Sequence, residues 1–139
     1  MGRRMKGRVL AGGSAQGRAL VLHEPLSLWG GMDPATGVLT DANHPQRGER
    51  LTGRVLVMPA VRGSSSASSV LAESVRARMH PAAILLGEPD LILAVGAAVA
   101  EELYGVRVPV LVMDATDLLA IRDGALVAVG EDGSVGVSR

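Results

Sequence analysis

Gly53-Arg54-Val55-Leu56-Val57-Met58-Pro59 is the stretch that decides the fold, and Arg62-Gly63-Ser64-Ser65-Ser66 follows it closely. A continuous apolar run with β-branched residues predicts a strand that is buried on both faces. Residues 70–78, which come after the serines, place their apolar side chains at helical spacing. We therefore expect a strand, a glycine turn and a helix, which is the repeating unit of an α/β fold.

The unit of strand, turn and helix recurs less regularly along the rest of the chain. Apolar runs bounded by Gly, Pro, Asp and Asn predict further strands at residues 8–10, 17–22, 27–31, 38–40, 82–86 and 108–113, and a C-terminal hairpin around Asp132-Gly133 within residues 125–137. Helices are expected at residues 91–103, with Gly105 as terminator, and at residues 114–119. The pattern shows no domain boundary. We expect one α/β domain over residues 1–139, in which a β-rich N-terminal half closes against a small β/α half with a parallel core.

Composition excludes several classes of protein. Fourteen Lys and Arg residues balance fourteen Asp and Glu residues, so the chain lacks the basic excess of a nucleic-acid binder. It has one Trp, one Tyr and no Phe, which leaves no base-stacking surface. It has no cysteine, so it forms no disulfide and offers no thiolate to zinc or to an iron–sulfur cluster. No apolar run reaches membrane-spanning length, and we expect a soluble, cytoplasmic protein.

The turn at residues 59–66 is the segment that can carry chemistry. A glycine between a buried strand and a helix allows a sharp turn, and the unpaired amides of the helix N-terminus then point to one place. Such a place binds carboxylate or phosphate, and Arg62 could add a bidentate contact to the same anion. Converging amides could also make a serine hydroxyl basic enough to accept a proton. On these residues alone, however, the favoured interpretation is that Ser64 or Ser65 merely caps the helix, with Ser66, Ser68 and Ser69 in its first turn.

Other polar residues give weaker signals. His44 precedes Pro45 and could be a ligand or a base, although a single loop histidine is more often a turn residue. Asp33 is expected to belong to the turn Asp33–Gly37. The sequence does not decide whether either side chain contributes to a site. Three histidines without metal-ligand spacing, in a chain without cysteine, argue against a self-contained metal site.

The order of the motifs resembles the small subunit of aconitase X, which in archaea is the small subunit of phosphomevalonate dehydratase. The resemblance covers nearly the whole chain, and the sequence and spacing of the motifs are more specific than any one of them. The motifs are Ser27–Gly37, Asp41–Pro45, Gly53–Pro59, Arg62–Ser66, Pro81–Leu85 and Gly105–Leu111.

This resemblance implies a swivelling β/β/α domain like the mobile domain of aconitase, and a large partner subunit whose cysteines hold an iron–sulfur cluster, expected to be [4Fe-4S]. The partner's cluster would act as a Lewis acid on the departing hydroxyl, while Ser64, the first serine after Gly63, would remove a proton beside the substrate carboxylate. Aconitase-like domains place an arginine two residues after this serine, where the present chain has Ser66. Arg62, Gly63, Ser65 and Ser66 are therefore candidates for substrate binding, together with residues of the partner, and this chain itself is expected to bind no metal.

The resulting hypothesis is the small subunit of a hydro-lyase that is inactive without its large subunit. Its expected reaction converts (R)-5-phosphomevalonate into trans-anhydromevalonate 5-phosphate in an archaeal-type mevalonate pathway. One alternative is the small subunit of cis-3-hydroxyproline dehydratase, which acts on an amino acid without a phosphate. Another is a non-catalytic module that binds an anion or a partner. A phosphohistidine carrier of the same shape would need a histidine in the glycine turn, and this turn has none.

Overall fold

The computed structural model describes residues 2–62 and 65–138. Its strands form a mixed sheet in the order β1-β8-β7-β3-β4-β5-β6-β2. Strands β3 to β6 are parallel to one another, and the remaining pairs are antiparallel. The strands are β1 (Arg3–Lys6), β2 (Arg8–Ala11), β3 (Ala15–Val21), β4 (Val55–Met58), β5 (Ala83–Leu86), β6 (Val110–Val112), β7 (Leu126–Val129) and β8 (Ser134–Ser138). The predicted α/β class is confirmed.

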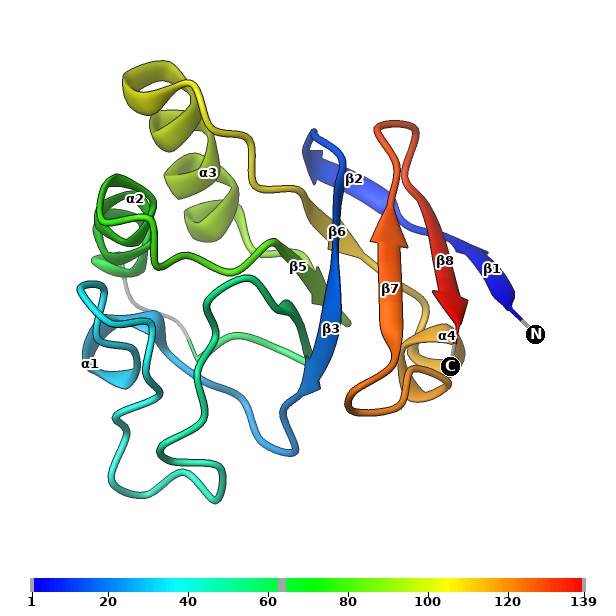
Figure 1. The fold of residues 1–139 in the computed structure, drawn as a ribbon, viewed down its shortest axis with the longest axis horizontal. Coiled ribbons are helices and arrows are strands. Elements are labelled where there is room, and N and C mark those ends of the chain that lie inside the picture. Colours follow the sequence, from blue (N-terminus) through cyan, green and yellow to red (C-terminus); the bar gives the residue numbers. More distant parts are fainter. Residues whose placement is uncertain (1, 63–64, 139) are drawn as a thin grey trace.

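The sheet curls round until its two edges meet. The edge strands β1 and β2 are consecutive in the sequence and are separated only by Gly7 (Figure 1). Gly7 donates its amide to Gly133 O at 2.8 Å, and a Cβ at this corner would lie 3.1 Å from Val112 O. A residue without a side chain therefore lets the chain pass from one edge of the sheet to the other.

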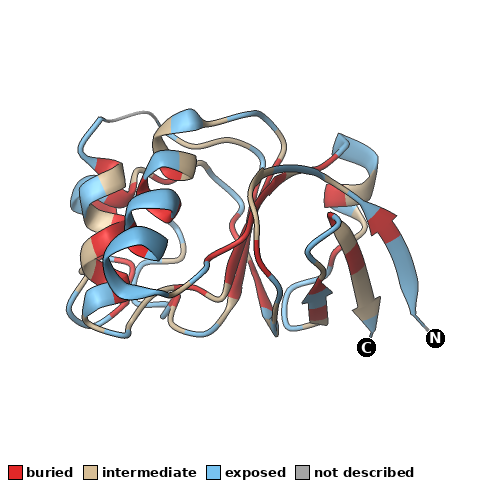
Figure 2. Ribbon diagram, turned by 90° about the horizontal axis from the view of Figure 1, so that it is seen from above, coloured by how far each residue is buried: buried red, intermediate tan, exposed pale blue. Residues whose placement is uncertain are grey.

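The central strands bury both of their faces, as the apolar run at residues 53–59 predicts. Because successive side chains of a strand point to opposite faces, Val55 and Val57 of β4 enter the core inside the curled sheet. Leu56 and Met58 enter a second core on the helix side. Figure 2 shows the buried residues concentrated along these strands. Strand β5 divides its side chains in the same way, so the parallel strands separate two apolar layers.

Two helices cover one side of the parallel strands, on the left of Figure 1: α2 (Ala67–Arg76) and α3 (Leu91–Tyr104). Asp90 caps α3 by accepting the Leu93 amide at 2.9 Å, and Gly105 ends it with φ +67°, as predicted. The helices pack closely, since a Cβ on Gly96 would lie 2.8 Å from Ser68 O. The short helix α4 (Ala115–Leu119) adds Leu118 to the core inside the sheet.

The long connection from β3 to β4 corrects two predictions. Residues 27–31, expected as a strand, form the kinked helical turn α1 (Leu28–Gly31), with Gly30 at φ +77°. Residues 38–40, also expected as a strand, form only isolated bridges from Val38 to Arg50 and from Leu39 to Met32. The reason is that Leu28, Met32 and Leu39 pack individually into the helix-side core. Burial, and not a strand ladder, accounts for their apolar spacing.

Candidate functional site

The site predicted from the sequence lies at the carboxyl edge of the parallel strands. Because β3, β4, β5 and β6 run in the same direction, the segments that follow them leave from the same edge. In open α/β sheets this edge is the usual place for a ligand. We call residues 59–66, which join β4 to α2, the serine turn. Gly63 and Ser64 of this turn lie outside the described residues.

Backbone hydrogen bonds hold the first residues of the serine turn. Val61 pairs with Leu26 in a parallel bridge, and the Arg62 amide donates to Leu26 O at 3.3 Å. The Gly87 amide, after β5, donates to Pro59 O at 3.1 Å. The beginning of the turn is thus fixed between the segments that follow the two neighbouring strands.

Helix α2 begins three residues before the stretch whose apolar side chains have helical spacing. It starts at Ala67 and not at residue 70, with Ser66 at the N-cap position. The Val70 amide donates to Ser66 O at 3.2 Å, and the Ser68 hydroxyl donates to Ser65 O at 3.1 Å. Ser65 and Ser66 are both exposed. The cap position that the favoured interpretation gave to Ser64 or Ser65 is therefore occupied by Ser66, and Ser65 precedes the helix.

Arg62 is an exposed cation at this edge. Its backbone is held against Leu26, whereas its guanidinium forms no hydrogen bond or ion pair with any side chain in residues 2–62 and 65–138. The N-terminus of α2, a ten-residue helix, begins five residues later. A guanidinium and the positive end of a helix dipole each favour an anion.

His44 has a structural role. It is buried, its Nδ1 accepts the Gln46 amide at 3.1 Å, and its Nε2 lies 3.1 Å from Glu24 O. A ring that accepts at Nδ1 and donates at Nε2 is neutral and has no nitrogen left for a substrate. The Gln46 side chain in turn donates to Val21 O at 2.7 Å, which fastens this loop to the end of β3.

Asp33 belongs to its turn, as expected from the sequence. Its carboxylate accepts the Ala35 amide at 2.9 Å, and its carbonyl accepts the Gly37 amide at 2.7 Å. Gly37 has φ +75°, the left-handed conformation that the motif predicts. The structure therefore gives Asp33 and His44 roles in the loop, and none of their hydrogen bonds within the described residues reaches the serine turn.

Two shallow hollows border the serine turn. One, of about 270 Å³, is lined by Ser65, Ser68 and the first turns of α3. The other, of about 220 Å³, is lined by His23, Pro59 and the end of α4. Both are lined mainly by apolar side chains. The turn therefore lies between two apolar depressions on the same edge of the sheet.

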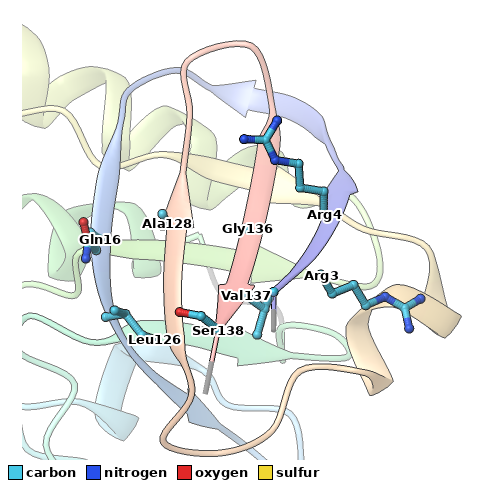
Figure 3. Close-up of a pocket in the computed structure, with 9 residues that line it drawn as sticks. Arg3, Arg4, Gln16, Leu126, Ala128, Gly136, Val137 and Ser138 are labelled. Atoms are coloured by element: carbon cyan, nitrogen blue, oxygen red, sulfur yellow. The ribbon is translucent and has the colours of Figure 1, made fainter.

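A larger hollow of about 530 Å³ lies elsewhere, on the antiparallel strands β1, β8, β7 and β3 (Figure 3). Small residues such as Ala128 and Gly136 form its floor, and Arg4 and Gln16 stand at its sides. None of its lining residues belongs to the serine turn. The short side chains of its floor leave this hollow open, and it does not coincide with the predicted chemistry.

The chain does not provide the donors of an iron–sulfur cluster. Its sequence contains no cysteine, and the described residues contain no group of three or more His, Asp or Glu side chains placed to hold a metal ion. Cluster iron is normally bound by thiolates, so the residues present do not fit such a group.

Among the helices of the described residues, none is long and apolar enough to cross a membrane.

Fold and site together define a β/β/α domain in which a curled sheet carries a helix pair on one side and a serine turn at the carboxyl edge of its parallel strands. The family model described as the aconitase X swivel domain matches residues 4–137. The chain belongs to this family.

The relatives carry two different names. A phosphomevalonate dehydratase small subunit from Thermococcus kodakarensis is 36% identical over 129 residues, which cover 93% of this chain and 91% of that protein. A cis-3-hydroxy-L-proline dehydratase from Pseudomonas aeruginosa is 50% identical over 103 residues, which cover 74% of this chain but only 18% of that protein. The chain thus spans about a fifth of the length of the Pseudomonas relative.

A solved structure supports the fold assignment. The crystal structure of Thermococcus kodakaraensis aconitase X in its holo form superposes with a TM-score of 0.86, at 34% identity and with 99% of both chains covered. The family, the fold and the resemblance stated from the sequence motifs agree, and the predicted resemblance is confirmed.

Proposed function

We propose that this chain, as a single swivel domain over residues 1–139, is the small subunit of a two-subunit, iron–sulfur-dependent hydro-lyase. The observation that carries the proposal is the serine turn. It lies at the carboxyl edge of the parallel strands of an aconitase X swivel domain, next to a helix N-terminus and an exposed Arg62 that has no side-chain partner among the described residues. This arrangement suits an anionic substrate that must lose a proton.

Ser64 is the proposed proton acceptor. Its oxygen takes the proton from the carbon next to the substrate carboxylate, and the electrons of that C–H bond form a double bond to the neighbouring carbon. The hydroxyl on the neighbouring carbon leaves as hydroxide and takes up one proton to become water, and Ser64 gives up the proton that it accepted. The protons therefore balance, and the reaction needs no oxidant or reductant. The amides of the serine turn and the N-terminus of α2 favour the ionised form of this oxygen.

Arg62, Gly63, Ser65 and Ser66 are proposed to bind the substrate anion. Arg62 is exposed and available for a bidentate contact, and Ser65 and Ser66 lie exposed at the start of α2. The cluster, proposed to be [4Fe-4S], is assigned to the large subunit because this chain has no cysteine to hold it. The small subunit alone is therefore expected to have no activity.

(R)-5-Phosphomevalonate is the proposed substrate and trans-anhydromevalonate 5-phosphate the product, in an archaeal-type mevalonate pathway. Support comes from the Thermococcus small subunit, whose similarity extends over 93% of this chain. A substrate with both carboxylate and phosphate also offers an anion to Arg62 as well as to the helix N-terminus.

cis-3-Hydroxy-L-proline is the second candidate substrate. The higher identity of 50%, over 74% of the chain, is to a dehydratase of that name. The two substrates share the loss of water beside a carboxylate, but only one carries a phosphate. An assay of the chain reconstituted with its cognate large subunit on both substrates, under anaerobic conditions, discriminates between them. Turnover of phosphomevalonate alone is expected, and turnover of hydroxyproline alone would reassign the substrate.

A further inference from the structure

Exposed apolar side chains surround the serine turn. The three other segments that leave the carboxyl edge each carry at least one large apolar residue in solvent. Trp29, after β3, is 61% exposed, Leu91, after β5, is 69% exposed, and Leu119, after β6, is 85% exposed. Because the parallel strands bring these segments to one edge, residues distant in the sequence share one surface.

The two hollows that border the serine turn connect it to these residues. Leu91 and Val95 line the same depression as Ser65 and Ser68. Leu119 lines the other depression together with Pro59, the first residue of the turn. Val95 is itself 54% exposed. Apolar side chains therefore lie on both sides of the segment that carries the proposed proton acceptor.

Trp29 stands on a backbone that is already fixed. Met32 donates its amide to Leu28 O at 3.1 Å, and the Thr40 amide donates to Gly31 O at 2.9 Å. Two residues before α1, Leu26 pairs with Val61 of the serine turn. A large aromatic side chain on a backbone that is fixed before binding is typical of an interface hot spot, since little backbone entropy is lost on contact.

We propose that Trp29, Leu91, Val95 and Leu119 form the docking surface for the large subunit. This inference rests on the proposed function. In the Pseudomonas relative the matched region makes up 18% of a much longer chain, so there a body several times larger accompanies this domain. A serine that accepts a carbon-bound proton must also be shielded from water. A large subunit that covers this apolar edge buries the four side chains and closes the site at once.

The test compares serine or alanine substitutions on the edge with a matched control. Leu91→Ser, Leu119→Ser and Trp29→Ala change the proposed surface, while Leu103→Ser changes an equally apolar residue, 63% exposed, near the opposite end of α3. The dissociation constant of each variant for the cognate, cluster-loaded large subunit is measured by biolayer interferometry under anaerobic conditions. Thermal unfolding of each isolated variant verifies its fold, which should be unaffected because these side chains are exposed.

Each edge variant is expected to bind at least about tenfold more weakly than wild type, and Leu103→Ser within about twofold. Equal binding by all variants would overturn the proposal, as would a loss for Leu103→Ser as large as that for Leu91→Ser. Self-association of the isolated chain that Leu119→Ser abolishes, with large-subunit binding unchanged, would instead assign the surface to a second copy. A pair that binds with the expected differences but dehydrates neither substrate refutes the proposed function and supports the docking surface.

Discussion

Replacing Gly37 by alanine should destabilise the fold far more than the same replacement at Gly53. Both glycines have a left-handed backbone, with φ +75° and +70°. Their surroundings differ, because a Cβ at Gly37 would overlap the Thr52 hydroxyl and lie 2.7 Å from Met79 O. At Gly53 no atom lies within 4 Å of the added carbon. A comparison of Gly37→Ala with Gly53→Ala therefore separates the cost of backbone strain from the cost of steric overlap.

The magnitudes follow from these contacts. A left-handed alanine costs about 1–2 kcal/mol, and this is the whole expected effect at Gly53. At Gly37 the Cβ must also displace the Thr52 hydroxyl from its 2.9 Å hydrogen bond to Met79 O, which costs about 1 kcal/mol. Crowding against the Met79 backbone adds about 1–3 kcal/mol. We expect Gly37→Ala to lower the free energy of unfolding by about 3–6 kcal/mol in total.

Urea unfolding of the isolated chain, followed by far-UV circular dichroism, measures both variants against wild type. The Thr52→Ala background provides a further check, since Gly37→Ala should cost less there once the hydroxyl is gone. Equal losses for Gly37→Ala and Gly53→Ala would refute the reasoning. They would mean that backbone strain alone accounts for the cost of alanine at both positions. The contact of Gly37 with Thr52 and Met79 would then be too loose to exclude a Cβ.

Three further predictions concern single side chains. Arg62→Ala should raise the KM of the assembled enzyme at least about tenfold through loss of an ionic hydrogen bond, with the unfolding midpoint of the isolated chain unchanged. Burial lowers the pKa of His80 below its ordinary 6.5, so the unfolded chain binds a proton at this histidine before the folded chain does as the pH falls. The free energy of unfolding should therefore decrease below pH 6.5. Urea titrations of His80→Gln should show a weaker dependence on pH. Ser27 has a buried hydroxyl without a hydrogen-bond partner in the described structure, so Ser27→Ala should leave stability equal or raise it by up to about 1 kcal/mol in the same assay.

The parallel core could be predicted from the sequence because its strands are apolar on both faces. Leu56 and Val57 of β4 face different cores, and only a strand between two apolar layers needs both to be hydrophobic. Closure of the sheet was not predictable in this way. In β1 only Met5 is buried, and the arginines and lysine around it give no strand periodicity. The pairing of β1 with β8 becomes apparent only in three dimensions.

The position of the serine turn was also predictable, because the strand before it and the helix after it are specified by local sequence patterns. His44 is a turn residue, as expected for a single loop histidine, but its contact with Glu24 O was not predictable, since Glu24 meets it only after the loop has folded. The exposed apolar residues around the turn were missed for a similar reason. The sequence hints at them only in α3, where Leu91 and Val95 are apolar although they lie outside the buried face that contains Leu93.

The most direct measurement of the central claim is the turnover number of the enzyme assembled from Ser64→Ala and the cognate, cluster-loaded large subunit. Ser69→Ala, an exposed serine on α2 outside the proposed site, is the matched control. With large-subunit binding and iron content equal to wild type, kcat should fall by about 10²–10⁴-fold for Ser64→Ala and stay near wild type for Ser69→Ala. Near-wild-type kcat for Ser64→Ala would show that another group accepts the proton.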